Sequence, residues 1–181
     1  MKYFILIAPL ILLPFGIHAE ATNAIKELEK NGGIISPTID GGLRVEFQLS
    51  GRDLKDEGLE PIKLLESVKV LNLRDTKITN AGIINIKGMK DLKRLHLERT
   101  NVDDGCIDYL TGLQELEYLN LYSTKVSDLG LSKLKDLKNL KKLYLWQTNV
   151  TNEGVKQLET ALPDLKIVQG VDLDKIIPVK K

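Results

Sequence analysis

Cysteine and histidine are scarce in this chain, and neither sign of charge is in excess. Cys106 is the single cysteine, so no intrachain disulfide can form and the core alone must hold the fold. The 26 basic and 25 acidic side chains give a net charge of +1. A chain this close to neutral lacks the basic footprint typical of proteins that bind nucleic acid or anionic membranes. We therefore expect no nucleic-acid partner.

Catalytic and metal-binding motifs are also missing. The sequence contains no HExxH, no phosphate-binding loop, no glycine motif for dinucleotides and no nucleophile elbow. His96 and Glu98 lie two residues apart on a predicted strand and would fit a base with its orienting carboxylate, but no nucleophile or oxyanion donor set accompanies them. We predict a non-catalytic protein without a cofactor or a bound metal.

The first 19 residues are typical of an export signal. Lys2 precedes an apolar run over residues 3–17 that contains two prolines, and Ala19 offers a small residue for cleavage. A bilayer span needs about 18 apolar residues. The run is shorter, which favours a cleaved signal over a retained anchor. We expect a secreted or periplasmic protein, held to a membrane only if this segment stays uncleaved.

A repeat of 24 residues organises the rest of the chain. Three copies superimpose at residues 68–91, 92–115 and 116–139, and a fourth at 140–164 carries one extra residue. A partial copy follows at 165–168, and a weaker copy lies upstream. The weaker copy has these residues in register: Phe47, Leu49, Leu54, Gly58 and Leu59.

The apolar columns of the repeat change from strand spacing to helix spacing. Two leucine columns lie two residues apart, which puts both on one side of a strand. They are Leu71, Leu95, Leu119 and Leu143, then Leu73, Leu97, Leu121 and Leu145. Apolar residues three apart follow and predict a helical segment. Each unit is therefore a strand, a turn and a helix, and stacked units bury the face that one unit alone would expose.

Two polar columns and the cysteine have structural interpretations. A threonine column after each strand is expected to bond the backbone of the adjacent repeat. It consists of Thr76, Thr100, Thr124 and Thr148. A second column is predicted to cap the helices. It consists of Asp56, Asn80, Asp104, Asp128 and Asn152. Cys106 replaces a glycine of the other copies, and we interpret it as a buried packing thiol.

The repeat pattern LxxLxLxxTxVTDxGLxxLxxLxx resembles that of bacterial leucine-rich-repeat proteins, close to the cysteine-containing subtype. The resemblance covers about residues 43–168, or about five repeats. Residues 20–42 are similar to the family's helical N-terminal cap, with a helix expected over 24–31. The resemblance implies an α/β solenoid, an arc with a parallel sheet on the concave face and helices on the convex face. Residues 169–181 would be a C-terminal cap or tail.

In such an arc, the strand residues between the leucines line the concave face. Four of the five Tyr and Trp residues beyond the export signal fall at these positions, in two adjacent repeats. Exposed Tyr, Trp and Arg dominate binding hot spots, although strands also favour aromatic residues for their own stability. The predicted ligand-binding residues are Arg94, His96, Glu98, Tyr118, Asn120, Tyr122, Lys142, Tyr144 and Trp146.

Three functions fit this sequence. A protein or peptide partner is favoured, because an export signal and an aromatic patch both suit recognition outside the cytoplasm. A glycan or cell-wall ligand is the alternative, since the faces of Tyr and Trp pack against sugar rings. The third is a structural protein of the cell envelope. In that case the apolar residues 176–179 would cover the open end of the solenoid or pair with another chain.

Overall fold

The computed structural model describes residues 15–47 and 49–170 of the chain. Seven strands form one sheet in chain order. The first pair is antiparallel, and each later strand is parallel to the one before it. The strands are β1 (Ile34–Pro37), β2 (Leu43–Glu46), β3 (Val68–Asn72), β4 (Arg94–His96), β5 (Tyr118–Asn120), β6 (Lys142–Tyr144) and β7 (Lys166–Val168).

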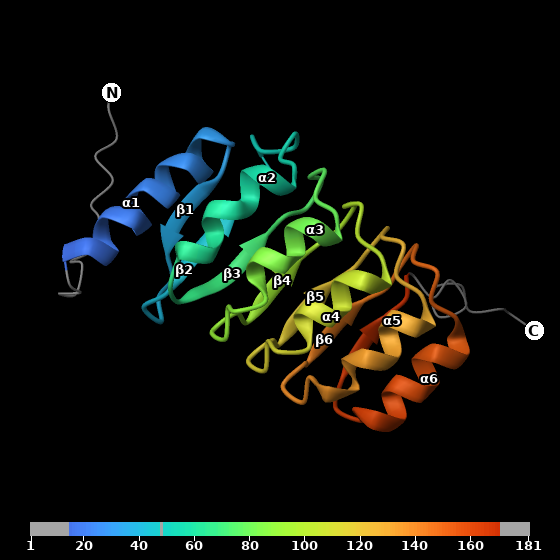
Figure 1. Cartoon of the computed structure of the whole chain (residues 1–181). Coiled ribbons are helices and arrows are strands. Elements are labelled where there is room, and N and C mark those ends of the chain that lie inside the picture. The colour runs from blue at the N-terminus through green and yellow to red at the C-terminus, as the bar shows by residue number, and fades with distance from the viewer. Residues whose placement is uncertain (1–14, 48, 171–181) are drawn as a thin grey trace, which may run out of the picture.

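Helical segments lie along one face of the sheet, in front of the strands in Figure 1. Each returns the chain to the start of the next parallel strand, which a tight turn could not do. The α-helical segments are α2 (Asp56–Leu59), α3 (Asn80–Ile83), α4 (Ile107–Leu110), α5 (Asp128–Lys133) and α6 (Asn152–Ala161). Single 3₁₀ turns extend four of them, namely η1 (Glu60–Leu64), η2 (Ile84–Ile86), η3 (Asp104–Cys106) and η4 (Leu134–Asp136). The predicted α/β solenoid is confirmed.

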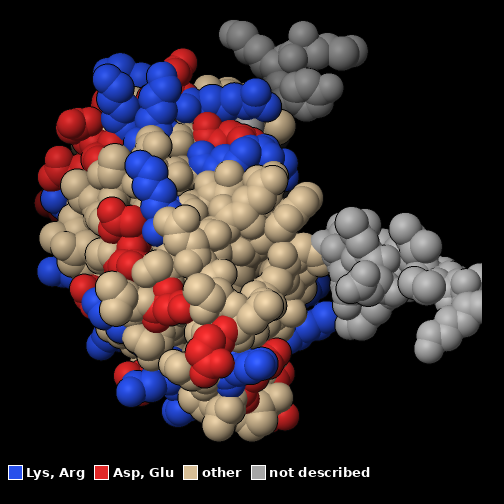
Figure 2. All heavy atoms as spheres, turned by 90° about the vertical axis from the view of Figure 1, so that its right-hand side faces the viewer, with Lys and Arg blue, Asp and Glu red and all other residues tan. Residues whose placement is uncertain are grey.

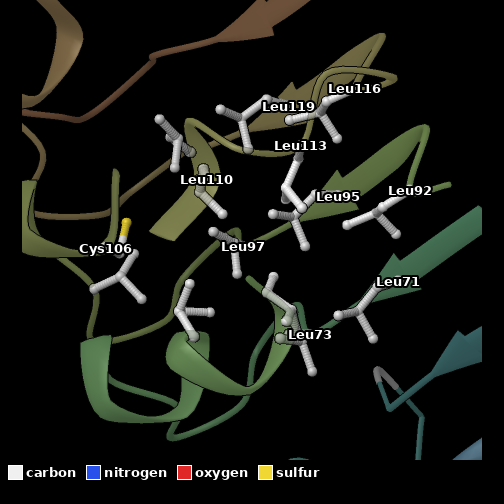
Figure 3. Packing of buried hydrophobic residues seen from close by; sticks show 14 of the residues in the cluster. Leu71, Leu73, Leu92, Leu95, Leu97, Cys106, Leu110, Leu113, Leu116 and Leu119 are labelled. Atoms are coloured by element: carbon white, nitrogen blue, oxygen red, sulfur yellow. The ribbon is translucent and has the colours of Figure 1, made fainter. Parts of the chain in front are cut away.

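The two leucine columns form the centre of the core. Leu71, Leu95, Leu119 and Leu143 are register partners across β3 to β6, and Ile167 continues the column in β7. All eight leucines of the two columns are at most 3% exposed. Leucines of the helical segments pack against them (Figure 3). Because burial of one leucine contributes about 2 kcal/mol, the stacking of neighbouring repeats is the main source of stability.

A long helix, α1 (Phe15–Lys30), closes the N-terminal end of the core. Ala24 and Leu28 share one helical face and are buried against the η1 segment. The helix begins before the predicted range 24–31 and continues through Ala19. Residues 1–14 of the predicted export signal lie outside the described residues. Within the described part of the chain, no helix is long and apolar enough to cross a membrane.

The upstream repeat differs from its predicted register. Val45, not Phe47, is the strand partner of Leu71. Phe47 therefore lies one column further on and is fully buried, whereas Leu49 is 72% exposed. The turn between Phe47 and Leu54 is two residues longer than the equivalent turns, so the strand shifts by two positions while the helical part keeps its frame. A shift of two leaves the inward-facing side unchanged, so Phe47 stays in the core while Leu49 leaves it.

The threonine column acts inside its own repeat. The Thr100 hydroxyl donates to the Leu97 carbonyl at 2.8 Å, and the other three threonines make the equivalent bond. The expectation that these hydroxyls reach the adjacent repeat is wrong, because a carbonyl three residues back is the nearer acceptor. The backbone joins the repeats instead. The Arg99 amide donates to the Tyr122 carbonyl at 2.9 Å, from a left-handed φ of 53° that recurs once in each full repeat.

The acidic column also joins neighbouring repeats. Asp104 accepts hydrogen bonds from the Ser127 amide at 2.7 Å and from the Ser127 hydroxyl at 2.6 Å. Asp56 and Asp128 bind the threonine of the following repeat in the same way. The helix N-caps lie one residue earlier than predicted, at Thr79, Asp103, Ser127 and Thr151. Each bridging carboxylate therefore holds the N-cap of the next repeat in place.

A glycine column leaves room for these carboxylates. A Cβ atom at position 130 would lie 2.5 Å from Asp104 Oδ1, closer than a carbon and an oxygen can approach. Gly82 faces Asp56, and Gly154 faces Asp128, in the same way. Each of these glycines is therefore required by the aspartate of the preceding repeat, whose carboxylate occupies the place of a side chain.

Cys106 stands in the glycine column at the one full repeat whose predecessor carries Asn80 instead of aspartate. Asn80 still bridges to the N-cap of the next repeat: its Oδ1 accepts from the Asp103 amide at 3.1 Å, and its amide donates to Asp103 Oδ1 at 2.5 Å. Cys106 is fully buried, which confirms its interpretation as a packing thiol. Burial, with smaller contributions from nearby aspartates, raises the pKa of the Cys106 thiol to about 12.

The glycine–aspartate coupling can be measured by substitution. We expect Gly130→Ala to lower the free energy of unfolding by about 1–3 kcal/mol, since the new methyl group overpacks the carboxylate. Gly88→Ala is the matched control, because a Cβ atom there meets nothing within 4 Å. Urea unfolding followed by circular dichroism would report both. In an Asp104→Ala background the cost of Gly130→Ala should shrink, and an undiminished cost would contradict the coupling.

The buried thiol makes a second prediction. At pH 8 we expect Cys106 to react with iodoacetamide on the order of 100-fold more slowly in the folded protein than in denaturant, because its thiolate is scarce and shielded. Mass spectrometry of timed samples would give both rates. Rapid stoichiometric labelling of protein that keeps its native circular dichroism spectrum would show that the site opens readily.

Candidate functional site

The side of the sheet that faces away from the helices forms a separate surface, which we call the open sheet face. It is defined by the nine predicted ligand-binding residues, all of which lie on β4 to β6 or in the turns after them. The first row is Arg94, Tyr118 and Lys142, the second is His96, Asn120 and Tyr144, and the third is Glu98, Tyr122 and Trp146. Strand register therefore brings all nine residues together in an array of three by three.

The aromatic rings of this array contact one another. The Tyr122 and Trp146 rings are stacked, with centroids 5.3 Å apart and an angle of 24° between their planes. Tyr118 contacts Tyr144 at 5.5 Å and His96 at 4.7 Å between ring centroids. Partial burial raises the pKa of Tyr118 above its ordinary value, which keeps its hydroxyl protonated. The predicted aromatic patch is present as two ring clusters on adjacent strands.

Trp146 is held between Tyr122 and a residue that the sequence did not identify. Gly170 follows β7 at the next position of the third row and has a φ of 129°. A Cβ atom on Gly170 would lie 2.8 Å from Cδ1 of Trp146. The absence of a side chain there lets the backbone pass close to the indole, which remains 46% exposed. Gly170 lies 24 residues after Trp146, so the repeat period, continued beyond the last full repeat, would have identified it as the neighbour of the indole.

Glu98 and Asn120 differ from their predicted role. Both were expected on the exposed surface, but they are only 5% and 8% exposed. The Asn120 amide donates to Glu98 Oε1 at 2.7 Å, and Asn120 Oδ1 accepts from the Tyr122 amide at 3.0 Å. Glu98 Oε1 also lies 3.1 Å from Nδ1 of His96. These two residues therefore position their neighbours, while the surface itself belongs to the other seven.

The buried network has one unsatisfied atom. Glu98 Oε2 is buried and has no hydrogen-bond partner among the described residues. An unpaired buried acceptor costs about 1–3 kcal/mol, so the network is weaker than a fully bonded one. Its benefit is orientation, because Glu98, in the turn after β4, links His96 in that strand to Asn120 in β5. The rings next to Glu98 and Asn120 thus have a polar support on their own face of the sheet.

Basic side chains accompany the rings. The Arg94 guanidinium lies 4.3 Å from the centre of the Tyr118 ring, and the Lys142 ammonium lies 5.1 Å from that of Tyr144. Such cation–π contacts hold flexible basic side chains in place at a contribution of about 0.5–1 kcal/mol when exposed. Viewed from the C-terminal side, uncharged side chains form a continuous area with both basic and acidic side chains along its borders (Figure 2).

Beyond the third row, an ion pair closes the edge of the face. Arg99 donates to both carboxylate oxygens of Asp75, one of them at 2.8 Å, and its guanidinium lies 5.7 Å from the centre of the Tyr122 ring. The hydrogen bonds from Arg99 hold the pKa of Asp75 below its usual range. Asp75 therefore stays ionised and paired with Arg99 at neutral pH.

The arrangement suits binding better than chemistry. Within the described residues, no group of three or more His, Cys, Asp or Glu side chains is placed to hold a metal ion. His96 and Glu98 do contact each other, but Glu98 is buried and engaged with Asn120. The surface offers a set of ring edges, one half-exposed indole and two basic groups, one on β4 and one on β6.

Comparison with known proteins supports the architecture. A family model described as a leucine-rich repeat matches residues 65–87. No curated protein sequence matches the chain. An internalin from Listeria monocytogenes has a similar structure, with a TM-score of 0.51 and 22% identity over 63% of this chain and 32% of the internalin. The chain therefore spans about a third of that protein.

Two further structures are similar over most of their own length. The leucine-rich-repeat ectodomain of the receptor kinase SOBIR1 from Arabidopsis thaliana has a TM-score of 0.51 and 19% identity, over 83% of this chain and 91% of that one. The tropomodulin C-terminal domain from Caenorhabditis elegans has a TM-score of 0.50 and 10% identity, over 80% and 92%. Leucine-rich-repeat domains are generally protein–protein interaction modules and are typically non-enzymatic. The repeat match, the register of the strands and these likenesses together show that the chain has a leucine-rich-repeat fold.

Proposed function

We propose that the chain is a non-catalytic module that binds a protein or peptide partner through the open sheet face. The observation that carries this proposal is that exposed Trp146 and Arg94 and half-buried Tyr122 lie together on consecutive repeats, above a core that needs none of them. Trp, Tyr and Arg are the residues that dominate binding energy in protein interfaces. Strand stability alone explains the ring pairs, but it does not explain a half-exposed indole at the end of the array.

A glycan ligand is supported less well by the ring geometry. A sugar ring stacks on an aromatic face, and the faces here already have neighbours. Tyr118 contacts Arg94, His96 and Tyr144, while Tyr122 contacts Trp146 and Arg99. Ring edges and the exposed part of the indole suit the mixed apolar and polar surface of a protein. A glycan remains the second candidate, because Trp146 is the one aromatic ring of the array that is close to half exposed.

The setting of this function is also a proposal. The sequence of residues 1–19 supports export, with cleavage near Ala19, and a place in the cell envelope or outside the cell. We propose that residues 20–42 form the cap, 43–168 the repeat domain and 169–181 a C-terminal cap or tail. The bacterial origin and the cysteine-containing subtype rest on the repeat pattern alone. A structural role in the envelope would need no exposed ring cluster, so we rank it last.

The binding proposal is tested on the two rings at the end of the array. Tyr122→Ala combined with Trp146→Ala should weaken capture of a partner at least about 30-fold, since a hot-spot residue contributes about 2 kcal/mol or more. Immobilised protein would be exposed to envelope proteins and, separately, to envelope glycans of the source cells, and bound material would be quantified by mass.

Leu129→Ala supplies the matched control, because Leu129 is 75% exposed on α5, on the helical side. Both variants should keep the circular dichroism spectrum of the parent. Loss of capture in the ring variant alone would support the open sheet face. Equal capture by all three proteins would refute it, and retention of glycans in place of proteins would favour the second candidate.

A further inference from the structure

Three basic side chains of the first row differ from the other cations near the sheet. Many lysines of the described chain form ion pairs, for example Lys93 with Asp40 and Lys141 with Glu117. By contrast, Arg94, Lys142 and Lys166 take part in no ion pair with a described carboxylate. They lie on β4, β6 and β7 in one row, with Lys142 and Lys166 as direct register partners. This row, which we call the basic row, is unneutralised.

The carboxylates of the same face are engaged elsewhere: Glu46, on β2, lies 3.8 Å from Arg44, and the two nearer β4 to β6 are withdrawn from the surface. Glu98 is 5% exposed and bonded to Asn120. Asp75 is paired with Arg99 and lies 3.3 Å from Arg74. Neither carboxylate can neutralise the basic row or attract a basic ligand. The chain as a whole carries a charge of only +1. The positive charge of this face is therefore local, and it arises because the basic side chains of the first row lie at the surface while the nearby carboxylates are buried or paired.

The basic row also has a geometry that a peptide can match. Adjacent strands lie about 4.8 Å apart, so Arg94 and Lys142 on β4 and β6 are separated by about 10 Å at the backbone. Alternate side chains of an extended peptide repeat at about 7 Å, which the long basic side chains can span. The rings of Tyr118 and Tyr144 hold two of these cations. Held cations lose less entropy when they bind a carboxylate.

We propose that the open sheet face takes an extended acidic segment of a protein. Its carboxylates would pair with Arg94, Lys142 and Lys166, and an apolar side chain would pack on Trp146. The inference rests on the proposed function and adds the chemistry of the partner. Peptide is favoured over an acidic glycan because the third row offers an apolar indole surface opposite the basic row, and alternating acidic and apolar side chains satisfy both.

The test uses synthetic peptides as probes. One alternates glutamate with leucine, a second alternates lysine with leucine, and both carry a fluorophore for anisotropy. We expect saturable binding of the acidic peptide alone, with an affinity that falls as salt rises from about 50 to 200 mM because exposed charges are then screened. Arg94→Glu combined with Lys142→Glu should weaken that binding at least about tenfold, as charge reversal at an interface imposes repulsion.

Two controls separate charge placement from net charge and from folding. Lys135→Glu combined with Lys138→Glu makes the same change of net charge on the helical side, where both lysines are exposed, and should leave binding within about twofold. Arg94→Lys combined with Lys142→Arg keeps the charges and should retain most of the affinity. Circular dichroism would verify that every variant is folded.

The outcomes distinguish this inference from the proposed function. Absence of saturable binding to the acidic peptide, or equal binding of the basic one, overturns the acidic partner. Normal binding of the acidic peptide by the charge-reversed variant would also overturn the acidic partner. The same holds if an acidic polysaccharide such as heparin binds through the basic row while the acidic peptide does not. In each of these cases the capture experiment decides the fate of the proposed function. If the variant with Tyr122→Ala and Trp146→Ala no longer captures the protein partner, the open sheet face remains a binding surface and only the acidic character of the partner is refuted.

Discussion

Stacking of leucines between consecutive repeats is the constraint on which the other features depend. Leu95 and Leu119 are strand neighbours, and each is covered from both sides by the equivalent residue of the adjoining repeat. The stacking buries one face of the sheet and fixes the register between neighbouring strands. The opposite face is then presented as aligned rows, so that residues 24 positions apart in sequence become neighbours in space. A contiguous surface arises without any residue on it being needed for the core.

Polar groups at the turns make this register specific. Hydrophobic stacking alone would tolerate small sliding of one repeat on the next. The bond from the Arg99 amide to the Tyr122 carbonyl and the bridge from Asp104 to Ser127 each connect one repeat to the following one. Gly130 admits the bridge by lacking a side chain. These contacts lie in the turns that follow the strands, so the positions of Tyr122 and Trp146 relative to each other are determined by the frame.

Much of this could be predicted from the sequence because a period of 24 residues fixes which side chains align. The leucine columns, the ring pair Tyr122–Trp146 and the burial of Cys106 followed from that period. Features set by partners in another repeat could not be found in this way. The aspartates were assigned to caps because a carboxylate before a helix usually caps it. Glu98 was expected at the surface because the pattern of one strand does not reveal the amide of Asn120 on the next.

The central claim is that the rings of the open sheet face contact the partner while the helical side does not. Hydroxyl-radical footprinting tests it directly, because Tyr and Trp react readily and Tyr109, on α4 at the helical side, is an internal reference in the same chain. The account predicts that bound partner slows oxidation of Trp146 and Tyr122 and leaves that of Tyr109 unchanged. Protection of Tyr109, with Trp146 and Tyr122 oxidised as fast as in the free protein, would contradict it.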